Sequence, residues 1–455
     1  MLTPKNLGND MAKALAFFSS SFLRPLLFVP TFGPISPEET TLRMTTDSET
    51  VGLSPERLAR IEPGIRAWID RGVIVGAHMM LARRGKIVYA RNLGQLDKEQ
   101  GRLMPIDAIF RIYSMTKPII CTALMTLYEE GRFQLITPAA KFIPALDRLK
   151  VLRQGEFGAM EEAIRRPITI GDLMCHTAGF TYDFLEDSPV SGRYREAGIN
   201  HDGHRTLEQW MQTLTRLPLA YQPGTQWQYS VSIDVAAYLI EVLTGQPLRD
   251  VLRQRIFAPL GMIDTDFFVP EEKLPRLCAM YGVGDITSPE MTHTKFCADT
   301  EAGVWGRLDV EESYPADRPE SFARGGHGLF STTDDYLRFA LMLSGGGALE
   351  GVRILGRKTC ELMHVNHLPA GLLPLRIGEL SLDGYGFGLG SRTLMDVGAA
   401  GIPGSVGEFG WAGAASTYYW VDPVEELVGV FMTQYQGMEA PGMDFRTLAY
   451  QAIVD

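Results

Sequence analysis

Ser114 and Lys117 form a Ser-x-x-Lys pair at the head of a strongly apolar run that reaches Tyr128. Because residues three apart lie on one face of a helix, the two side chains are expected to face each other. A serine hydroxyl is a weak nucleophile until a neighbouring group takes its proton. A partly desolvated lysine one turn away can have a pKa low enough to assist. The pair indicates a nucleophilic serine, although alone it also fits a helix-capping serine beside a solvated lysine.

The residue after this lysine indicates where the helix begins. Pro118 is tolerated only in the first turn, because proline lacks the N–H that a deeper position needs. The helix is therefore predicted to begin at Ser114 and to end near Gly131. Its first-turn N–H groups and its dipole would then face Ser114 and stabilise an anion that develops there.

Tyr229 is a candidate general base. It follows a turn at 222–225 and stands at the head of a predicted helix at 231–244. A phenol near a lysine ammonium has a lowered pKa and can accept a proton. The alternative is an ordinary packed tyrosine, which is the default for most of the 16 tyrosines in the chain.

A run of small residues from Gly407 to Ser416 opens a predicted strand. Such a run lets a substrate approach the backbone closely. The strand edge can give one backbone N–H to an oxyanion hole, with the N–H of Ser114 as the other. Taken alone, the segment favours a β-bulge or a tight bend.

Composition limits the function classes. The 455 residues carry a formal charge of -11, which argues against nucleic acid or an anionic membrane as partner. Five scattered cysteines without a C-x-x-C pair suggest neither a disulfide framework nor a zinc site. Residues 1–53 are predicted to be a poorly ordered extension with no uninterrupted stretch of transmembrane length and no signal peptide.

The pattern along the chain predicts how these residues are held. A helix at 55–71 and a β-hairpin at 73–92 precede Ser114. Segment 140–250 is helix-rich, with a loop at 187–203. Further predicted elements are helices at 169–175, 206–216, 247–260, 334–343 and 443–454, and strands at 385–389, 416–421 and 427–434. Strands at both ends imply one sheet built from both termini, with a helical lobe inserted.

Together these motifs resemble the serine β-lactamase and penicillin-binding-protein superfamily, and within it the class C β-lactamase-like esterases called family VIII carboxylesterases. The resemblance runs from about residue 54 to the end. The residues that carry it are Ser114-Met-Thr-Lys117, Leu173-Met-Cys-His176-Thr-Ala-Gly179, Pro223-Gly224 before Tyr229-Ser-Val, Gly326-x-Gly328-Leu-x-Ser331-Thr332, and Trp411-Ala-Gly413 before Tyr419-Trp-Val-Asp-Pro423.

The resemblance implies an α/β (α+β) fold with an antiparallel sheet flanked by helices. The sheet domain would comprise 54–140 and 255–455, and a mostly helical domain 141–254, with the active site between them. It also implies site residues. Ser114, Lys117 and Tyr229 would be catalytic, and the N–H groups of Ser114 and Ala414 would form the oxyanion hole. Substrate contacts would come from Tyr113, Trp411, Ala412 and Gly413.

Two departures from the β-lactamase pattern favour esters. Trp411 stands where Lys-Thr-Gly has its lysine, and an apolar aromatic there suits a neutral acyl or aryl ester better than an anionic drug. Tyr-Ser-Val replaces Tyr-Ala-Asn after Tyr229, so the amide that would hold a β-lactam side chain is missing. The expected enzyme is a carboxylesterase for short to medium acyl or aryl esters, and weak β-lactam turnover stays open.

The same resemblance implies no metal or cofactor and a small-molecule ester as partner. No stable membrane insertion and a cytoplasmic location are also expected. A periplasmic or secreted location and the oligomeric state stay open. Three alternatives remain: a β-lactamase or D-aminopeptidase-type amide hydrolase, an acyltransferase of the same fold, and a non-catalytic penicillin-binding-like module.

Competing motifs are weaker. The segment Pro403-Gly-Ser405-Val-Gly407 nearly matches the Gly-x-Ser-x-Gly elbow of α/β-hydrolases, but no strand-to-helix elbow surrounds it. His176 and His327 stand in turn contexts, where either could be the base of a Ser-His-Asp triad, and the resemblance implies that both are structural. His364 and His367 have no acidic partner nearby in sequence, so metal binding by this pair is not expected.

Overall fold

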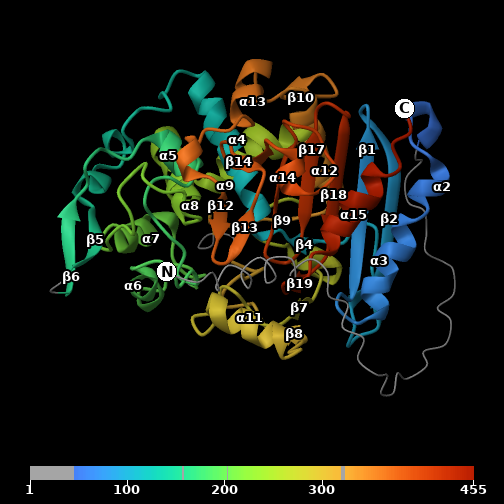
Figure 1. Cartoon of the computed structure of the whole chain (residues 1–455), viewed down its shortest axis with the longest axis horizontal. Coiled ribbons are helices and arrows are strands. Elements are labelled where there is room, and N and C mark those ends of the chain that lie inside the picture. Colours follow the sequence, from blue (N-terminus) through green and yellow to red (C-terminus); the bar gives the residue numbers. More distant parts are fainter. Residues whose placement is uncertain (1–45, 156–157, 202, 319–322) are drawn as a thin grey trace, which may run out of the picture. The chain divides into compact units, whose positions relative to one another are not determined.

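The computed structural model describes residues 46–155, 158–201, 203–318 and 323–455. Its central element is an antiparallel sheet of eight strands in the order β14-β15-β16-β17-β18-β1-β2-β3 (Figure 1). The strands are β1 (Gly76–Arg83), β2 (Lys86–Asp97), β3 (Arg102–Leu103), β14 (Tyr385–Phe387), β15 (Arg392–Leu394), β16 (Phe409–Ala412), β17 (Tyr418–Asp422) and β18 (Leu427–Met432). Because β1 pairs with β18, the prediction of one sheet built from both ends of the chain is confirmed.

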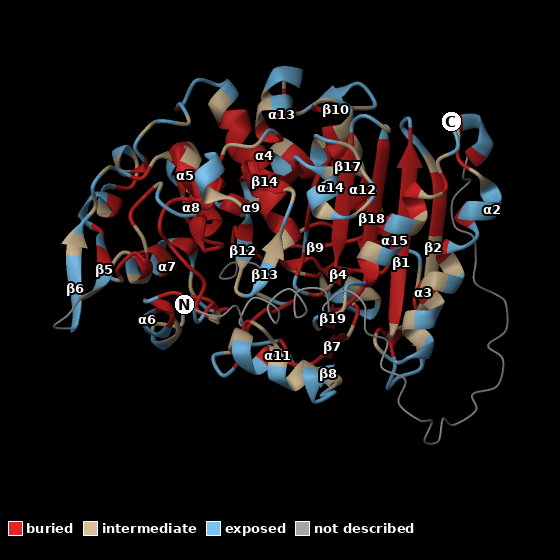
Figure 2. Cartoon of the chain, viewed as in Figure 1, coloured by how far each residue is buried: buried red, intermediate tan, exposed pale blue. Residues whose placement is uncertain are grey.

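Both faces of this sheet are covered, so its central strands are buried throughout (Figure 2). On one face, Met79 and Leu81 of β1 share a core with α3 (Ile61–Asp70) and α15 (Pro441–Tyr450). On the other face, Met80 belongs to a core with α12 (Thr333–Ser344). Alternate residues of one strand thus face opposite layers, as the pleat requires. The mixed fold of antiparallel sheet and flanking helices agrees with the expected class.

Helix α4 (Thr116–Glu129) lies inside the protein and continues a 3₁₀ turn, η2 (Tyr113–Met115). Every residue from 116 to 127 is buried, which explains why the sequence is apolar on all sides of this helix. It packs against α8 (Ser232–Thr244), which in turn contacts α5 (Ile170–Met174). Proline 118 lies in the first turn, as predicted from its missing N–H.

The remaining described elements are shorter. They are η1 (Ser48–Val51), α2 (Pro55–Leu58), β4 (Phe110–Arg111), η3 (Ala139–Lys141), η4 (Pro144–Arg148), β5 (Lys150–Gly155), β6 (Gly158–Ala163), α6 (Ser191–Glu196), α7 (Leu207–Leu214), α9 (Leu248–Leu252), η5 (Arg253–Phe257), α10 (Ala258–Leu260), η6 (Glu271–Arg276), β7 (Met280–Gly282), α11 (His293–Glu301), β8 (Gly306–Leu308), β9 (Phe330–Ser331), β10 (Ala348–Leu349), β11 (Val352–Arg353), α13 (Arg357–Met363), η7 (Ala370–Leu372), β12 (Leu375–Ile377), β13 (Leu380–Leu382), α14 (Val397–Ala400) and β19 (Tyr435–Gln436).

Some local predictions differ from the structure. The loop predicted at 187–203 contains helix α6, so that prediction is wrong over Ser191–Glu196. The hairpin of β5 and β6 was not predicted, because most of β6 is exposed and shows no buried-exposed alternation. Near the start, η1 precedes residue 54 and buries Val51, so the folded chain begins a few residues earlier than expected. The expectation for residues 1–45 lies outside the described residues.

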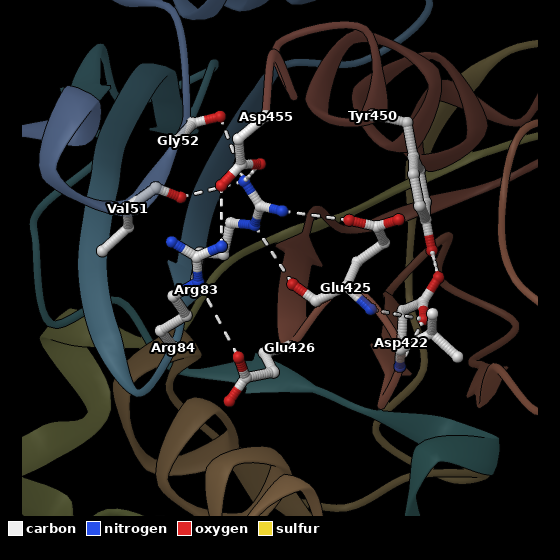
Figure 3. Close-up of polar contacts among 10 residues, drawn as sticks. Val51, Gly52, Arg83, Arg84, Asp422, Glu425, Glu426, Tyr450 and Asp455 are labelled. Carbon is white, nitrogen blue, oxygen red and sulfur yellow. Dashed lines mark hydrogen bonds and ion pairs between the residues drawn. The ribbon is translucent and has the colours of Figure 1, made fainter.

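Two hairpin turns and the last residue of the chain are joined by a buried arginine, as Figure 3 shows. Arg83, at the end of β1, donates to the carbonyl oxygens of Val51 and Gly52 at 2.9 and 3.0 Å. It also pairs with Glu425, in the turn before β18, at 3.0 Å and with Asp455 at 2.6 Å. These contacts tie the first and last described segments to one end of the sheet.

Across the described ranges, no helix combines the length and the apolar character that crossing a bilayer requires.

Candidate active site

Ser114 lies in the 3₁₀ turn η2, immediately before the buried helix α4. Its Oγ accepts a hydrogen bond from Lys117 Nζ at 2.9 Å. It also accepts a hydrogen bond from the hydroxyl of Tyr229 at 2.7 Å. Lysine 117 comes from the same helix turn, whereas the tyrosine is 115 residues away in sequence. The structure therefore brings the three predicted catalytic side chains together on one oxygen atom.

Lys117 is a fully buried cation with 0% exposure. Its Nζ donates a second hydrogen bond to the carbonyl oxygen of Gly326 at 2.6 Å. It also lies 4.6 Å from the ring centroid of Tyr229 and 5.2 Å from that of Tyr182. A buried ammonium requires such partners, because an unpaired charge in the interior is costly. The lysine is thereby held between the serine and the tyrosine.

Tyr229 is surrounded by aromatic rings. The indole Nε1 of Trp411 donates a hydrogen bond to its hydroxyl at 3.3 Å. The rings of Trp227 and His176 lie 6.3 and 5.0 Å from the tyrosine ring, and Tyr182 lies at 5.1 Å. These contacts fix the phenol against Ser114 and leave it little access to water. The location before helix α8, predicted from the sequence, orients the side chain toward α4.

The end of strand β16 lies close to the serine turn because Gly413 has no side chain. A Cβ at this position would be 2.4 Å from the carbonyl oxygen of Ile112. That carbonyl lies two residues before Ser114, so the glycine permits the close approach. Ala412 and Ala414 are exposed on either side of it. The backbone of the strand end is therefore next to the turn that carries Ser114.

Tyr113 is placed in the core, and of the other predicted substrate-contacting residues Trp411 and Gly413 are also buried whereas Ala412 is exposed. Tyr113 is 1% exposed, packs against Tyr314 at 4.7 Å, and its hydroxyl accepts a hydrogen bond from Gln436 Nε2 at 2.8 Å. Burial raises the pKa of this phenol well above its ordinary value. Its contact with substrate stays a prediction, and the structure gives it a packing role beneath Ser114.

The two histidines interpreted as structural are buried near Lys117. Burial, together with the positive charge of Lys117, lowers the pKa of both His176 and His327 well below the ordinary value, so both rings are neutral. His176 Nδ1 shares a hydrogen bond with the hydroxyl of Ser230 at 3.1 Å. Its ring therefore supports the loop that carries Tyr229 and packs against that residue.

Two groups near Lys117 were not predicted as functional. One is the Gly326 carbonyl, which lies in the quoted Gly326-x-Gly328 motif but was assigned only to a turn. The other is Asp234, whose Oδ1 accepts a hydrogen bond from the N–H of Gly326 at 2.9 Å. Its signal was one of two acids in the apolar stretch 231–244, the other being Glu241, but an acid in a first helical turn is also expected from the helix dipole alone.

A separate cavity of about 480 Å³ lies beside β7 and β8. Its lining includes Arg102, Arg111 and Arg307 together with Asp97 and Glu311, and it does not include Ser114. Positive and negative side chains are paired there, and burial raises the pKa of the lining thiol Cys278 well above its ordinary value. The hydrogen-bonded cluster around Ser114, not this cavity, is the candidate active site.

Comparison with known proteins agrees with this geometry. The sequence model of a family described as Beta-lactamase matches residues 59–452. Esterase EstB of Burkholderia gladioli is 30% identical over 383 residues, which cover 81% of this chain and 88% of that protein. A lovastatin esterase of Penicillium rubens is 28% identical over 385 residues, covering 80% and 90%.

Among solved structures, EstCE1, described as a hydrolase with promiscuous acyltransferase activity, aligns with a TM-score of 0.71. It is 27% identical in sequence, and the alignment covers 87% of this chain and 99% of that chain. A structure described as a family VIII carboxylesterase aligns with a TM-score of 0.63 over 88% of this chain and 98% of that one. At 17% identity, this second likeness supports the fold alone.

Proposed function

This chain belongs to the beta-lactamase family, and from that premise we propose that it is a serine ester hydrolase in which Ser114 forms the acyl-enzyme. The observation that supports this most directly is the convergence of Lys117 and Tyr229 on the hydroxyl oxygen of Ser114, at 2.9 and 2.7 Å. The proposed base and the cation are thereby both within hydrogen-bond reach of the nucleophile, and the cation lies 4.6 Å from the ring centroid of the base.

In the acylation step, Ser114 Oγ attacks the ester carbonyl carbon while Tyr229, as a phenolate, accepts the serine proton. The ammonium of Lys117 and the indole N–H of Trp411 both stabilise negative charge on that phenolate oxygen. When the tetrahedral intermediate collapses, the ester C–O bond breaks and Tyr229 returns the proton to the leaving alcohol.

The oxyanion of the intermediate is proposed to bind the backbone N–H groups of Ser114 and Ala414. The close contact of Gly413 with Ile112 supports this pairing, because it holds the end of β16 against the serine turn. Water then attacks the acyl-enzyme, its proton passes to Tyr229, and the acid is released as Ser114 regains the proton.

The division into a sheet domain (54–140 and 255–455) and a helical domain (141–254), with this site between them, also remains our proposal.

The substrate is proposed to be a small neutral ester with a short to medium acyl or an aryl group. Esterase EstB and lovastatin esterase, by their names, are enzymes that cleave esters. In this chain Trp411 packs edge-on against Phe387 at 5.2 Å, which gives the site an aromatic wall where the β-lactamase pattern has a lysine. We keep the cytoplasm as the proposed compartment, with support from the five cysteines, all of them free thiols.

The direct test uses p-nitrophenyl esters of increasing acyl length with the wild type, Ser114→Ala and Ser405→Ala. Ser405 is the matched control, because it belongs to the competing Gly-x-Ser-x-Gly-like segment. Mass spectrometry after rapid quenching should show one acyl group on Ser114 in the wild type and in the S405A variant, and none in S114A. Full esterase activity in S114A would show that another residue is the nucleophile.

Acyl transfer is a second candidate, favoured by the likeness to EstCE1 and its described promiscuous acyltransferase activity. The same acyl-enzyme serves both reactions, because an alcohol can replace water in the second step. Adding a primary alcohol to the ester assay separates the two. Transfer gives a new ester at the expense of free acid, whereas strict hydrolysis leaves the amount of acid unchanged.

A further inference from the structure

Beyond the three residues on Ser114, we propose that Asp234 is a positioning residue whose carboxylate, acting through Gly326, supplies the counter-charge that holds the Lys117 ammonium at the nucleophile. This inference rests on the proposed function, since it assigns a role within the same reaction. Asp234 touches neither Ser114 nor Tyr229 through any hydrogen bond between described atoms, so it acts through Lys117.

The connection runs through a single residue. The N–H of Gly326 donates to Asp234 Oδ1 at 2.9 Å, and the carbonyl oxygen of the same glycine accepts from Lys117 Nζ at 2.6 Å. Gly326 is therefore held on both sides, by the carboxylate at its N–H and by the ammonium at its C=O. The carboxylate fixes where the carbonyl points, and the carbonyl fixes the lysine.

Charge gives the second reason. Lys117 and Asp234 are 0% and 1% exposed, and buried charges persist in proteins where they are compensated. Burial raises the pKa of Asp234, whereas the Gly326 N–H and the charges of Lys117 and Arg324 oppose that rise. Two buried cations thus lie near this one carboxylate, and its removal would leave them with less compensation.

The contact between Gly326 and Asp234 leaves no room for a side chain at position 326. A Cβ on Gly326 would lie 2.5 Å from Asp234 Oδ2 and 2.5 Å from the hydroxyl oxygen of Tyr182. A side chain there would push the carboxylate away from the backbone. Asp234 itself belongs to the first turn of α8, which begins three residues after Tyr229. One carboxylate therefore links the element that follows the base to the loop that holds the lysine.

Several other ionisable groups face Lys117 and must be counted in any pH experiment. They come from the serine turn, α4, the His176 loop, α8 and its preceding loop, and the Gly326 loop. The groups are Ser114, Cys121, His176, Tyr182, Tyr229, Asp234 and His327, and Arg324 lies near the last two of these. Since both histidines are neutral, Asp234 is the one carboxyl group in this set.

The test is Asp234→Asn, which keeps the shape and the acceptor for the Gly326 N–H but removes the charge. We expect kcat to fall roughly 10- to 100-fold with little change in KM, because a charged partner is lost from the catalytic lysine and not from the substrate. The pH profile of kcat should also change, because a charged group is removed from beside the site. A loss of packing alone would lower the rate without changing the shape of that profile.

Asp335→Asn is the matched control. Asp335 is another buried aspartate in the first turn of a helix, and it accepts hydrogen bonds from the Asp264 N–H and the Thr265 hydroxyl at 2.8 and 2.9 Å. Its partners lie on a different loop, so D335N should leave kcat and the pH profile unchanged. An equal loss in D335N would show that any buried charge matters equally, which would overturn the assignment.

A second variant tests the same contact without removing a charge. Gly326→Ala displaces the carboxylate sterically while both charges remain, and it should also lower kcat and leave KM nearly constant. If D234N does not fold, this variant carries the test. A kcat within twofold of wild type and an unmoved pH profile in D234N, or an unchanged kcat in G326A, would overturn the proposal. Acyl-enzyme mass spectrometry separates this from failure of the proposed function, because D234N must still acylate Ser114, only more slowly.

Discussion

The indole nitrogen of Trp411 lies 3.3 Å from the hydroxyl oxygen of Tyr229, so the residue at the position of the β-lactamase lysine contacts the proposed base directly. The sequence had led us to interpret Trp411 as a determinant of substrate charge. The structure adds a second role, because an N–H donor stabilises negative charge on the phenol oxygen. An aromatic side chain can thus replace the lysine in the site without leaving the phenolate unsupported.

Trp411→Phe should lower kcat/KM about 10-fold, because it removes one hydrogen bond, worth about 1.4 kcal/mol, to a charged oxygen. The aromatic packing on Phe387 is kept. Trp227→Phe is the control: Trp227 also packs on Tyr229, but its Nε1 has no hydrogen-bond partner among the described residues. Steady-state kinetics with one p-nitrophenyl ester compares the two. Equal losses in both variants would assign the effect to ring size.

Trp411→Lys should move the preference of the site toward anionic substrates. A lysine there provides a cation for the carboxylate of a β-lactam and removes the aromatic wall that suits a neutral ester. We expect the ratio of cephalosporin to ester turnover to rise by about tenfold or more, which is about 1.4 kcal/mol. Parallel assays with a chromogenic cephalosporin and a p-nitrophenyl ester measure this ratio. An unchanged ratio would mean that position 411 does not set selectivity.

Tyr229→Phe should reduce kcat by roughly 10²- to 10⁴-fold, the usual range for removal of a general base. The fold should persist, since the ring stays packed against Tyr182 and His176. Tyr194→Phe serves as the control, because it also removes a buried hydroxyl, one that donates to the Pro218 carbonyl at 3.1 Å. Near-normal activity in Y229F would leave Lys117 as the base.

Gly413→Ala should impair both stability and catalysis. The new Cβ would lie 2.4 Å from the Ile112 carbonyl oxygen and 2.3 Å from Thr417 Oγ1, so the strand end must move away from the serine turn. We expect a destabilisation of about 1–3 kcal/mol and a fall in kcat. Gly192→Ala is the comparison, since nothing lies within 4 Å of a Cβ there and the helix should tolerate it. Thermal unfolding and ester kinetics measure both effects.

His364 should make folding stability depend on pH. Burial lowers its pKa from 6.5 to about 4, so the folded state holds it neutral. The unfolded chain binds more protons between these values, and stability is therefore lost as pH falls from above 6.5 toward 4. The loss is about 3 kcal/mol for this group. It is read as the difference in unfolding free energy between wild type and His364→Phe across this range.

The control for this measurement is internal. At pH 7.5 the variant should be about 1 kcal/mol less stable, because it loses the hydrogen bond from Nδ1 to the Cys360 carbonyl. The difference in unfolding free energy between wild type and variant should become smaller and then change sign as pH falls toward 4. A constant difference over the whole range would contradict the assignment of this titration to His364.

Many elements were readable from local pattern. Apolar periodicity and turn residues predicted three features: the end of α4 near Gly131, the β1–β2 hairpin, and the pairing of both chain ends in one sheet. They did not predict the exposed hairpin of β5 and β6, since β6 has no buried face to create an alternating pattern. Helix α6 was missed because its segment, Ser191–Glu196, is short and polar. Such elements depend on contacts with distant residues, not on local propensity.

The sequence by itself determined that Ser114 and Lys117 meet, because a spacing of three in a helix brings two side chains together whatever surrounds them. It also indicated Tyr229 and the glycine-containing strand, through motif order. Only the tertiary structure decided that Trp411 donates to Tyr229, that Tyr113 is buried, and that Asp234 and Lys117 meet at Gly326. These relations join residues 92 to 209 positions apart, and no local pattern encodes which backbone carbonyl receives a buried ammonium.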